Sequence, residues 1–532
     1  MFRALLAAAC LLLCSAAEAQ QALGVATVEA RLTADGVRAD VRLSRPVLGF
    51  TFQEASVVRE GDFVVLTEGL TLSGNRISSG APFQRFSILI QPMTRERDAK
   101  YPAFFRVGTG GVLFAPALWG NSAEWLTHLR LRTAGGQVLR PVNSAQGSVY
   151  IGPRANVTTM RDVVLIAAPN TPPALRDAAV AEMRSALAFY SQRLGVPLRE
   201  RPVMIVTHEG GGGRFVGDVT PAPTMSLRFY GDGWAAPNAR SRADLRRYVA
   251  HESFHFWNGS LVTHREDTPT WLHEGGAEYA ALLSARAAGE LSDEDVLRAL
   301  GDALTQCRTR LRFLGDVAMN DLAFLSSGIR YPCGLVIQWT ADLAIHAHSG
   351  GERDVLDAWG HVARVALARE DRGFELADFT GYNGVANSAD AIAQLTEQRG
   401  ADRWAALTNA LRSLGATVEE RPSNTTRSEA LLMHLSRLSC ATGSRGYGVT
   451  GADVTVNAEC GVLASEPVVT SVEGGSPADV STEFYAHLQA ICAARGDFAL
   501  VLNGSERVSL PCRSALPQPE NAFVVTASPT LN

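Results

Sequence analysis

The sequence predicts a multi-domain α+β protein. Residues 20–155 contain short alternating strands at regular spacing, separated by Gly, Asn and Ser turns, which is typical of a β-sandwich. Residues 243–430 show mostly helical periodicity of apolar side chains, and β-type runs return from about residue 436. These changes divide the 532 residues into a leader at 1–19, a β-sandwich at 20–155, an α/β domain at 156–290, a helical domain at 291–435 and a small β-rich, disulfide-containing domain at 436–532.

The leader has the pattern of a cleaved export signal. Arg3 supplies a short positive region, Ala4 to Ala16 form an apolar run, and Ala17-Glu18-Ala19 fits the small-x-small cleavage pattern. The apolar run is too short to span a bilayer comfortably. We therefore expect cleavage after Ala19 and a periplasmic or secreted protein without a membrane span.

The α/β domain opens with the strand-length apolar runs RDVVLIAAP and RPVMIVTH, separated by a helical pattern that ends in Gly195. A Gly-rich loop at 210–213 and a third strand, TMSLRFYG, follow. The loop lacks the Lys-Ser/Thr pair that would follow it in a phosphate-binding loop, so we expect a flexible turn.

The formal net charge of -5 provides no strong basic field, and a nucleic-acid partner is not expected.

Six cysteines remain after removal of the leader, and an even number in an exported protein suggests disulfides. They are Cys307, Cys333, Cys440, Cys460, Cys492 and Cys512. Because they contain no C-x-x-C pair, a thiolate zinc site is not indicated. Sequential pairing would close three short loops, although the other connectivities stay open.

The pentapeptide His251-Glu252-Ser253-Phe254-His255 carries the predicted chemistry. Residues four apart lie on one face of a helix, so both imidazoles can reach the same metal ion, and neutral imidazole is a good zinc donor. Glu252 is offset around the helix, where it would approach a water on the metal and act as a general base. The amphipathic segment LRRYVA that precedes the motif supports a helix here.

A third ligand is needed, and Glu274 follows His255 after eighteen residues. Its segment, TPTWLHEGGAEY, is predicted to form the next helix, with Pro269 near the first turn. Two helices joined by a loop of this length can place Glu274 beside the histidines. The spacing of the three residues resembles that of the gluzincin metallopeptidases.

HESFHFWNG followed by WLHEGGAEY resembles the glycyl aminopeptidase family and, more distantly, aminopeptidase N. The resemblance implies a thermolysin-like α/β domain with one Zn²⁺ held by His251, His255 and Glu274, and Glu252 as base. It also implies that Tyr331 occupies the place of the tyrosine in the family's Tyr-x-Lys-Gly motif and stabilises the oxyanion. Cys333 stands where the family has Lys. The segment VVTSVEGGSPA resembles part of a PDZ domain, so the C-terminal domain would bind a partner peptide.

Aminopeptidases of this clan carry an acidic motif on an edge strand before the first histidine. The strand that we assign to it, TMSLRFYG, has Arg228 and no carboxylate, which leaves endo- and exopeptidase specificity both open.

Glu278, four residues after Glu274, would either accept the second N–H of a ligand imidazole or lie on a solvated surface. His264 and His273 are expected at the surface or in the joining loop, and Asn258 would brace the end of the motif helix.

The function predicted from these residues is zinc-dependent peptide hydrolysis, aminopeptidase-like, on a peptide substrate. Three alternatives stay open: the same metal acting on epoxides, a structural zinc site, and a non-catalytic binding or scaffold descendant of a gluzincin peptidase. The intact Glu252 and the set of only three ligands favour a catalytic site.

Overall fold

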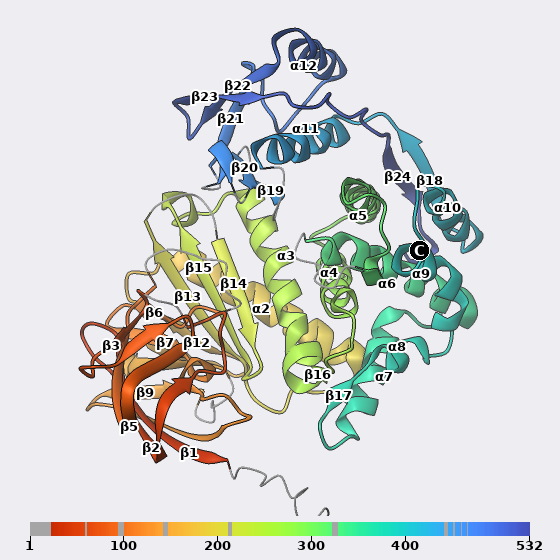
Figure 1. Cartoon of the computed structure of the whole chain (residues 1–532). Helices are drawn as coiled ribbons and strands as arrows, with labels where there is room; N and C mark the ends of the chain where they lie inside the picture. The colour runs from red at the N-terminus through yellow and green to blue at the C-terminus, as the bar shows by residue number, and fades with distance from the viewer. Residues whose placement is uncertain are drawn as a thin grey trace, which may run out of the picture. The chain divides into compact units, whose positions relative to one another are not determined.

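The computed structural model describes residues 23–58, 61–93, 101–141, 147–210, 215–321, 328–440, 445–450, 453–458, 460–464 and 467–531. The predicted leader and most of the Gly-rich loop lie outside these residues. The chain folds into two compact units (Figure 1). The first contains the residues up to 170 together with 203–207, and the second contains 171–202 and 208–532.

The first unit is built on a six-stranded sheet in the order β3-β5-β2-β1-β8, with β4 paired to β5. Its strands are β1 (Gly24–Leu32), β2 (Val37–Thr51), β3 (Phe63–Val65), β4 (Thr71–Ser73), β5 (Arg76–Ile90) and β8 (Trp125–Arg132). β1 is antiparallel to β2 and parallel to β8. Along β1, Ala26, Val28 and Ala30 are buried while the residues between them face outward, as a sheet with one covered face requires.

A second, four-stranded sheet has the order β6-β7-β10-β9. Its strands are β6 (Phe104–Val107), β7 (Gly110–Phe114), β9 (Gln137–Arg140) and β10 (Ser148–Pro153). Phe50 and Ile88 of the first sheet share one apolar cluster with Leu113 and Ile151 of the second. Burial of this shared apolar surface holds the two sheets together.

Three further strands extend the first unit. β12 (Val164–Ala167) pairs antiparallel with β11 (Val157–Thr159) and parallel with β13 (Val203–Glu209). Ile166 of β12 and Ile205 of β13 pack in an apolar cluster with Val112 and Tyr150.

The second unit begins with helix α2 and continues with the hairpin and the two helices that carry the sequence motifs. These elements are α2 (Pro173–Leu194), β14 (Phe215–Thr220), β15 (Thr224–Tyr230), α3 (Ala239–His255), a π-helical turn η4 (Phe256–Leu261) and α4 (Thr270–Ala287). α2 ends where Gly195 adopts the left-handed conformation that favours glycine. α3 begins where the Asn238 side chain accepts the Ser241 N–H, and Pro269 precedes α4.

Most of the remaining helices form a helical layer. They are α5 (Asp293–Phe313), α6 (Arg330–Ser349), α7 (Val355–Leu367), α8 (Leu376–Thr380), α9 (Ala389–Thr396) and α10 (Arg403–Ser413), and the short strands β16 (Thr263–His264) and β17 (Gly373–Phe374) pair beside them. The layer is centred on α6, which packs against α4, α5, α7 and α9. α5 starts with a reciprocal cap between Ser292 and Asp295. The disulfide Cys307–Cys333 joins α5 to α6.

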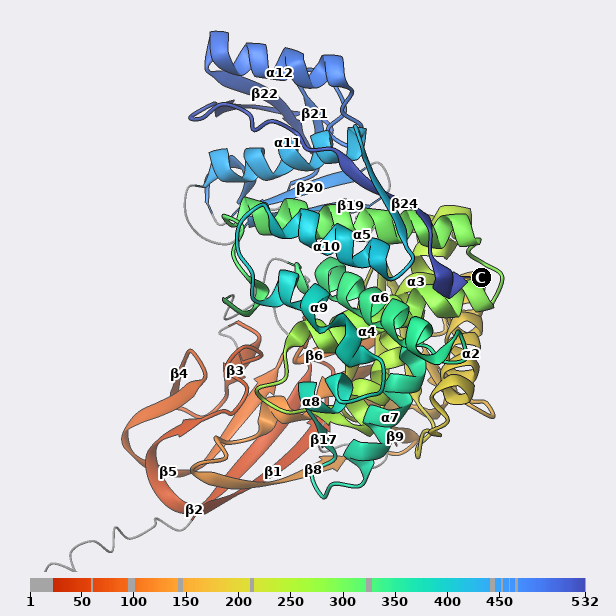
Figure 2. The same cartoon turned by 90° about the vertical axis from the view of Figure 1, so that its right-hand side faces the viewer.

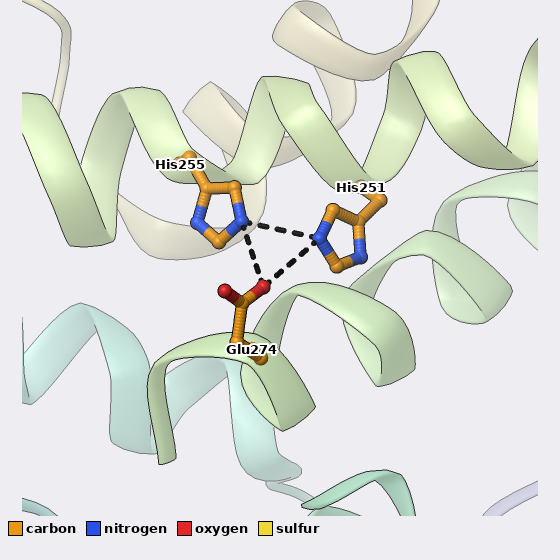
Figure 3. A group of neighbouring side chains, drawn as sticks. All are labelled: His251, His255 and Glu274. Atoms are coloured by element: carbon orange, nitrogen blue, oxygen red, sulfur yellow. Dashed lines mark hydrogen bonds and ion pairs between the residues drawn. The ribbon is translucent and has the colours of Figure 1, made fainter. Parts of the chain in front are cut away.

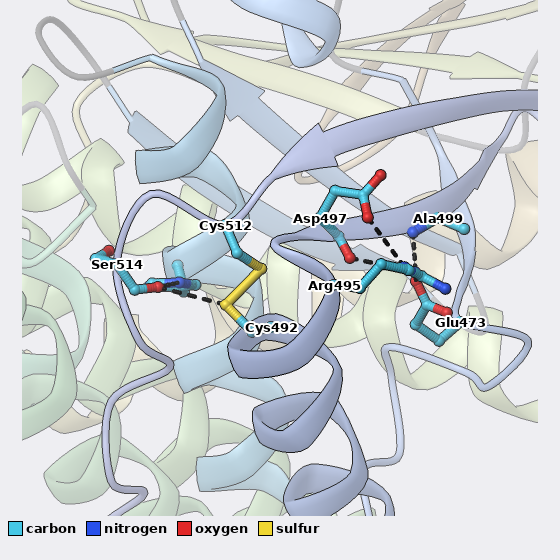
Figure 4. Close-up of a disulfide and its surroundings, with 8 residues drawn as sticks. Glu473, Cys492, Arg495, Asp497, Ala499, Cys512 and Ser514 are labelled. Atoms are coloured by element: carbon cyan, nitrogen blue, oxygen red, sulfur yellow. Dashed lines mark hydrogen bonds and ion pairs between the residues drawn. A yellow bond between two sulfur atoms is a disulfide. The ribbon is translucent and has the colours of Figure 1, made fainter.

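The last part of the second unit has its own apolar cluster. Its elements are α11 (Asn424–Ser439), β19 (Arg445–Thr450), β20 (Asp453–Ala458), β21 (Val469–Val472), α12 (Thr482–Arg495), β22 (Asp497–Leu502) and β23 (Glu506–Pro511). The disulfides Cys440–Cys460 and Cys492–Cys512 stabilise it. Figure 4 shows the second of these at α12, near Arg495, which forms ion pairs with Glu473 and Asp497.

The chain then returns to the helical layer. β24 (Ala522–Ala527) pairs antiparallel with β18 (Thr417–Arg421) beside α5 (Figure 2). The Phe523 N–H donates to Thr305 Oγ1 of α5 at 2.8 Å, and Trp339 Nε1 of α6 donates to Ser528 Oγ at 3.1 Å. The final residues are therefore part of the helical core.

The predicted mixture of helical and β regions in several parts is confirmed. The six cysteines pair sequentially, which decides a connectivity that the sequence left open. No described helix combines the length and apolar composition that a membrane crossing requires. The domain boundaries and the PDZ-like character of the C-terminal part stay predictions.

Candidate metal centre

The two motif histidines lie on one face of α3, one turn apart. His251 Nε2 and His255 Nε2 are 3.1 Å apart, and the residues are 6% and 7% exposed. Figure 3 shows both rings directed toward α4. The four-residue spacing thus brings two nitrogen atoms to one point.

Glu274 of α4 completes a triangle with the histidines. Its Oε2 lies 3.4 Å from both His251 Nε2 and His255 Nε2 (Figure 3). Ligands of a tetrahedral zinc ion with bonds of about 2.0–2.1 Å are separated by roughly 3.3–3.4 Å. The triangle therefore has the dimensions that such an ion needs. Within the described ranges, these three residues form the only group of three or more His, Cys, Asp or Glu side chains close enough to share a metal.

Each imidazole has a partner on its other nitrogen. His255 Nδ1 lies 2.8 Å from Asn258 Oδ1, and the Asn258 amide donates to the His273 carbonyl at 2.9 Å, which fixes Oδ1 as the acceptor. His251 Nδ1 lies 3.2 Å from Glu278 Oε1. Placing the proton on Nδ1 of each ring leaves both Nε2 lone pairs available for a cation.

The π-helical turn η4 places Asn258. Because this turn follows directly after His255, Asn258 folds back beneath the imidazole and is 1% exposed. Trp257 anchors the same turn by donating from Nε1 to the Val196 carbonyl at 2.7 Å. The expectation that Asn258 braces the end of the motif helix agrees with this geometry.

A close crossing of two helices places α6 beside the ligand Glu274. A Cβ atom on Gly275 would lie 2.3 Å from the Gly334 carbonyl carbon, and one on Gly334 would lie 2.6 Å from the Trp271 oxygen. Only glycine fits at either position of this contact. The start of α6, with Arg330 and Tyr331, is thereby held close to the triangle.

The charges of the centre are mutually compensated. Burial disfavours the charged form of His251, but contacts with Glu274 and Glu278 outweigh it and raise its pKa to about 10. Burial also opposes ionisation of Glu278, yet Arg247 Nη2, 2.7 Å from Oε2, and His251 lower its pKa to about 2. The pKa of Glu274 is held well below its usual value, because its hydrogen bonds to both histidines outweigh its burial.

Glu252 is placed beside the triangle but is not part of it. It is 8% exposed, and burial raises the pKa of its carboxyl group despite the neighbouring His251 and His255. Tyr248, one turn earlier on α3, donates a hydrogen bond to this carboxylate. The side chain is therefore held in place by its own helix.

Tyr331 lies at the start of α6, and its ring centroid is 5.9 Å from that of His251. Its hydroxyl oxygen accepts a hydrogen bond from Arg330 Nη2 at 3.1 Å, and Arg330 Nε lies 3.7 Å from Glu274 Oε1. Burial and the Glu274 charge raise the pKa of Tyr331 to about 12, so the hydroxyl keeps its proton at neutral pH.

The placement of His273 differs from the surface or loop position expected. It belongs to α4, stacks on His255 with ring centroids 4.2 Å apart, and its Nδ1 lies 3.0 Å from the Asn258 carbonyl. Burial and the nearby His255 hold its pKa well below the usual value. His264 lies on the exposed strand β16, with its ring 5.0 Å from that of His273.

The hairpin of β14 and β15 differs from the single edge strand expected from the sequence. TMSLRFYG corresponds to β15, but the strand β14 precedes it and carries Asp218. Arg228 Nη1 of β15 lies 2.8 Å from Asp218 Oδ2, and both side chains are largely buried. A carboxylate is therefore present in this hairpin, paired with the arginine. The Gly217-Asp218 pair interrupts the apolar pattern of β14, which explains why the sequence pattern missed the strand.

Comparison with solved structures shows a shared fold. The chain matches an aminopeptidase N family protein from Idiomarina loihiensis with a TM-score of 0.57 and 11% identity, over 95% of this chain and 99% of that one. It also matches Legionella pneumophila aminopeptidase A in complex with aspartic acid, at a TM-score of 0.42 and 13% identity, over 75% of this chain and 50% of that one. No protein-family model matches the sequence. No curated protein sequence matches it significantly. The first likeness establishes the fold alone.

Proposed function

We propose that the protein is a zinc-dependent peptidase of the aminopeptidase type. The observation that carries this proposal is the triangle of His251 Nε2, His255 Nε2 and Glu274 Oε2, with sides of 3.1, 3.4 and 3.4 Å. Three protein ligands is the number that catalytic zinc sites use, whereas structural sites use four. The fold shared with an aminopeptidase N family protein agrees with this function.

In this proposal His251, His255 and Glu274 hold one Zn²⁺ ion. A zinc ion bound there supplies a Lewis acid that makes a water molecule nucleophilic near neutral pH. Asn258 and Glu278 keep the two imidazoles in the tautomer that presents Nε2.

Glu252 moves the proton. Its carboxylate accepts a proton from the attacking water and delivers it to the leaving nitrogen of the cleaved peptide bond. Burial raises the pKa of this carboxyl group toward neutral pH. Such a pKa suits a group that must both take and release a proton. The hydrogen bond from Tyr248 orients it.

Tyr331 donates from its hydroxyl group to the developing oxyanion of the substrate. Because Arg330 donates to the hydroxyl oxygen, the tyrosine hydrogen is free to point toward the substrate. Arg330 is thus a positioning residue for Tyr331.

The substrate is a peptide. Asp218 is the carboxylate of the hairpin that could meet a substrate amine, but its pairing with Arg228 compensates its charge. Amino-terminal trimming and internal cleavage are both compatible with this pairing. The cut positions in the experiment below distinguish them. The three disulfides agree with an exported, periplasmic or secreted enzyme, since such bonds persist in oxidising compartments.

The test combines zinc analysis with digestion of an unbiased peptide library by the wild type and by Glu252→Gln. We expect one zinc per chain in both proteins and cleavage by the wild type alone, with activity reduced at least ~10³-fold in the variant. Glu294→Gln, at a side chain 87% exposed on α5, is the matched control and should cleave normally. Stoichiometric zinc without cleavage by the wild type would instead support the non-catalytic binding or scaffold alternative.

A further inference from the structure

The outer face of the six-stranded sheet carries a concentration of arginines that the net charge of -5 does not suggest. These residues alternate with the buried or half-buried residues of β1, β2, β5 and β8, so all project from the same side of the sheet. We call this surface the arginine face, and it consists of Arg31, Arg38, Arg42, Arg85, Arg130 and Arg132.

The strand register places five of these arginines directly opposite another arginine, whereas Arg130 of β8 is opposite Glu29 of β1. Arg31 of β1 is paired with Arg38 of β2 on one side and with Arg132 of β8 on the other. Arg42 of β2 is paired with Arg85 of β5. Like charges directly opposite in neighbouring strands destabilise a sheet. The opposed arginines therefore do not stabilise the sheet.

Two carboxylates lie among the arginines and compensate only part of their charge. Arg38 Nε is 3.2 Å from Asp40 Oδ1, and Arg132 Nη2 is 2.9 Å from Glu29 Oε1. Among the residues that the structure describes, no carboxylate lies within ion-pair distance of Arg42, Arg85 or Arg130. These three guanidinium groups are exposed and free to bind an anion.

The same three arginines border a hollow of about 600 Å³. Glu29, Asp40, Thr27 and Ser87 line it as well, which places carboxylate and hydroxyl oxygens among the guanidinium groups. Guanidinium groups bind carboxylate or sulfate groups, whereas carboxylates accept hydrogen bonds from hydroxyl groups. A ligand that satisfies both kinds of group carries anionic substituents and many hydroxyls on one chain.

We propose that the arginine face binds an acidic polysaccharide, a sugar chain that carries carboxylate or sulfate groups. Glu29 and Asp40 keep acceptor sites beside their arginine partners, and the hydroxyl groups of a sugar chain can donate to these sites. The phosphodiester groups of a membrane surface or of a nucleic acid carry no hydrogen to donate, so they fit the hollow less well. The aromatic ring in the lining, Phe86, is only 2% exposed, so it offers no surface for stacking of bases. The arginine face belongs to the first unit and the metal centre to the second, and the inference does not depend on peptidase activity.

The test measures binding of the full chain to polygalacturonate and to heparin, with neutral dextran, phosphatidylglycerol vesicles and single-stranded DNA as comparison probes. Arg42→Ser/Arg85→Ser removes two charges of the arginine face. Arg199→Ser/Arg507→Ser removes two charges from exposed arginines elsewhere and is the matched control. We expect an acidic polysaccharide to bind, binding to weaken with added salt, and the first double variant to weaken it roughly three- to tenfold more than the control.

Thermal unfolding of each variant establishes that it is folded, and Arg130→Ser replaces the double variant if that protein fails to fold. The inference is overturned if neither acidic polysaccharide binds, or if both double variants lose the same affinity. Tighter binding to vesicles or to DNA than to either polysaccharide would also overturn it, in favour of a membrane or a nucleic acid. Binding by Glu252→Gln should equal that of the wild type, which separates this surface from the proposed peptidase site.

Discussion

The metal centre and the arginine face handle charge in opposite ways. At the metal centre the charged groups are mostly buried, and His251, Glu274 and Glu278 each lie within 3.4 Å of a group of opposite charge. On the arginine face, Arg31 lies between two other arginines in the strand register, in contact with solvent. Burial makes an unpaired charge costly, whereas water and salt screen charges at the surface.

The difference predicts where substitutions have large effects. Removing one member of a buried, paired set leaves its partner without compensation, so function and stability both change strongly. Removing an exposed charge changes the free energy of unfolding little, and its effect is expected on long-range binding instead.

The largest effect is expected for Glu274→Ala. The substitution removes one of the three proposed ligands and leaves His251 and His255 without their carboxylate partner. We expect zinc content to fall well below one per chain and peptidase activity to drop at least ~10³-fold. Metal analysis after dialysis checks this, and full zinc occupancy would refute the ligand set.

Asp342 is a buried carboxylate that forms no ion pair with any of the residues that the structure describes. Burial, with the nearby Asp354, raises its pKa to about 7, although it accepts hydrogen bonds from the Tyr279 hydroxyl at 2.7 Å and the Val355 N–H at 2.8 Å. A pKa above that of the unfolded chain means that the protonated form stabilises the fold. This contribution is complete below about pH 4 and is lost as the pH rises through about 7.

Asp342→Asn should remove this pH dependence. We expect the wild type to lose up to about 1.4 kcal/mol of unfolding free energy per pH unit between these limits from this group, and the variant to lack that slope. Denaturant unfolding at several pH values measures it. Asp390→Asn, at an exposed position of α9, is the control and should retain the wild-type slope. Parallel curves for Asp342→Asn and the wild type would contradict the assignment.

A smaller effect is expected for Glu278→Gln. The substitution keeps the shape of the side chain but removes the carboxylate that lies between His251 Nδ1 and Arg247. Loss of such a partner of a ligand imidazole weakens metal affinity roughly 10–100-fold. Competition with a zinc chelator measures the change, and affinity equal to that of Glu294→Gln would show that Glu278 does not support the ligand.

The smallest effect is expected for Arg132→Ala on the arginine face. Its ion pair with Glu29 is exposed, with 60% and 45% of the two side chains accessible. We expect the free energy of unfolding to change by less than about 0.5 kcal/mol, and less still at high salt. Denaturant unfolding at low and high ionic strength checks this. A loss of more than ~1 kcal/mol of unfolding free energy would contradict the small contribution expected of an exposed ion pair.

The parts of the metal centre that follow from helical spacing could be predicted from the sequence. His251 and His255 are one turn apart on one helix, and Glu274 and Glu278 are one turn apart on another. Such spacing depends only on local helix geometry. The same spacing could have revealed Tyr248, which lies one turn before Glu252.

The contacts between helices could not be predicted in this way. Arg247 reaches Glu278 only because α3 and α4 adopt one particular register, and Arg330 reaches Glu274 only because Gly275 and Gly334 let α4 and α6 approach closely. Non-local packing of this kind leaves little trace in a single sequence. β14 was missed for a different reason, since a strand with Gly217 and Asp218 at its centre lacks a strong apolar pattern.

The return of the final strand has a consequence for biogenesis. β24 completes a pair with β18, whose nearest partner residues, Arg421 and Ala522, are separated by the whole C-terminal part. Contacts so distant in sequence form slowly and require residues 522–527 to be present. The helical layer beside the metal centre therefore cannot be completed until the residues of β24 have emerged from a ribosome or a translocation pore. A shortened chain that lacks β24 should remain vulnerable to proteases, even though every residue of the catalytic motif is present.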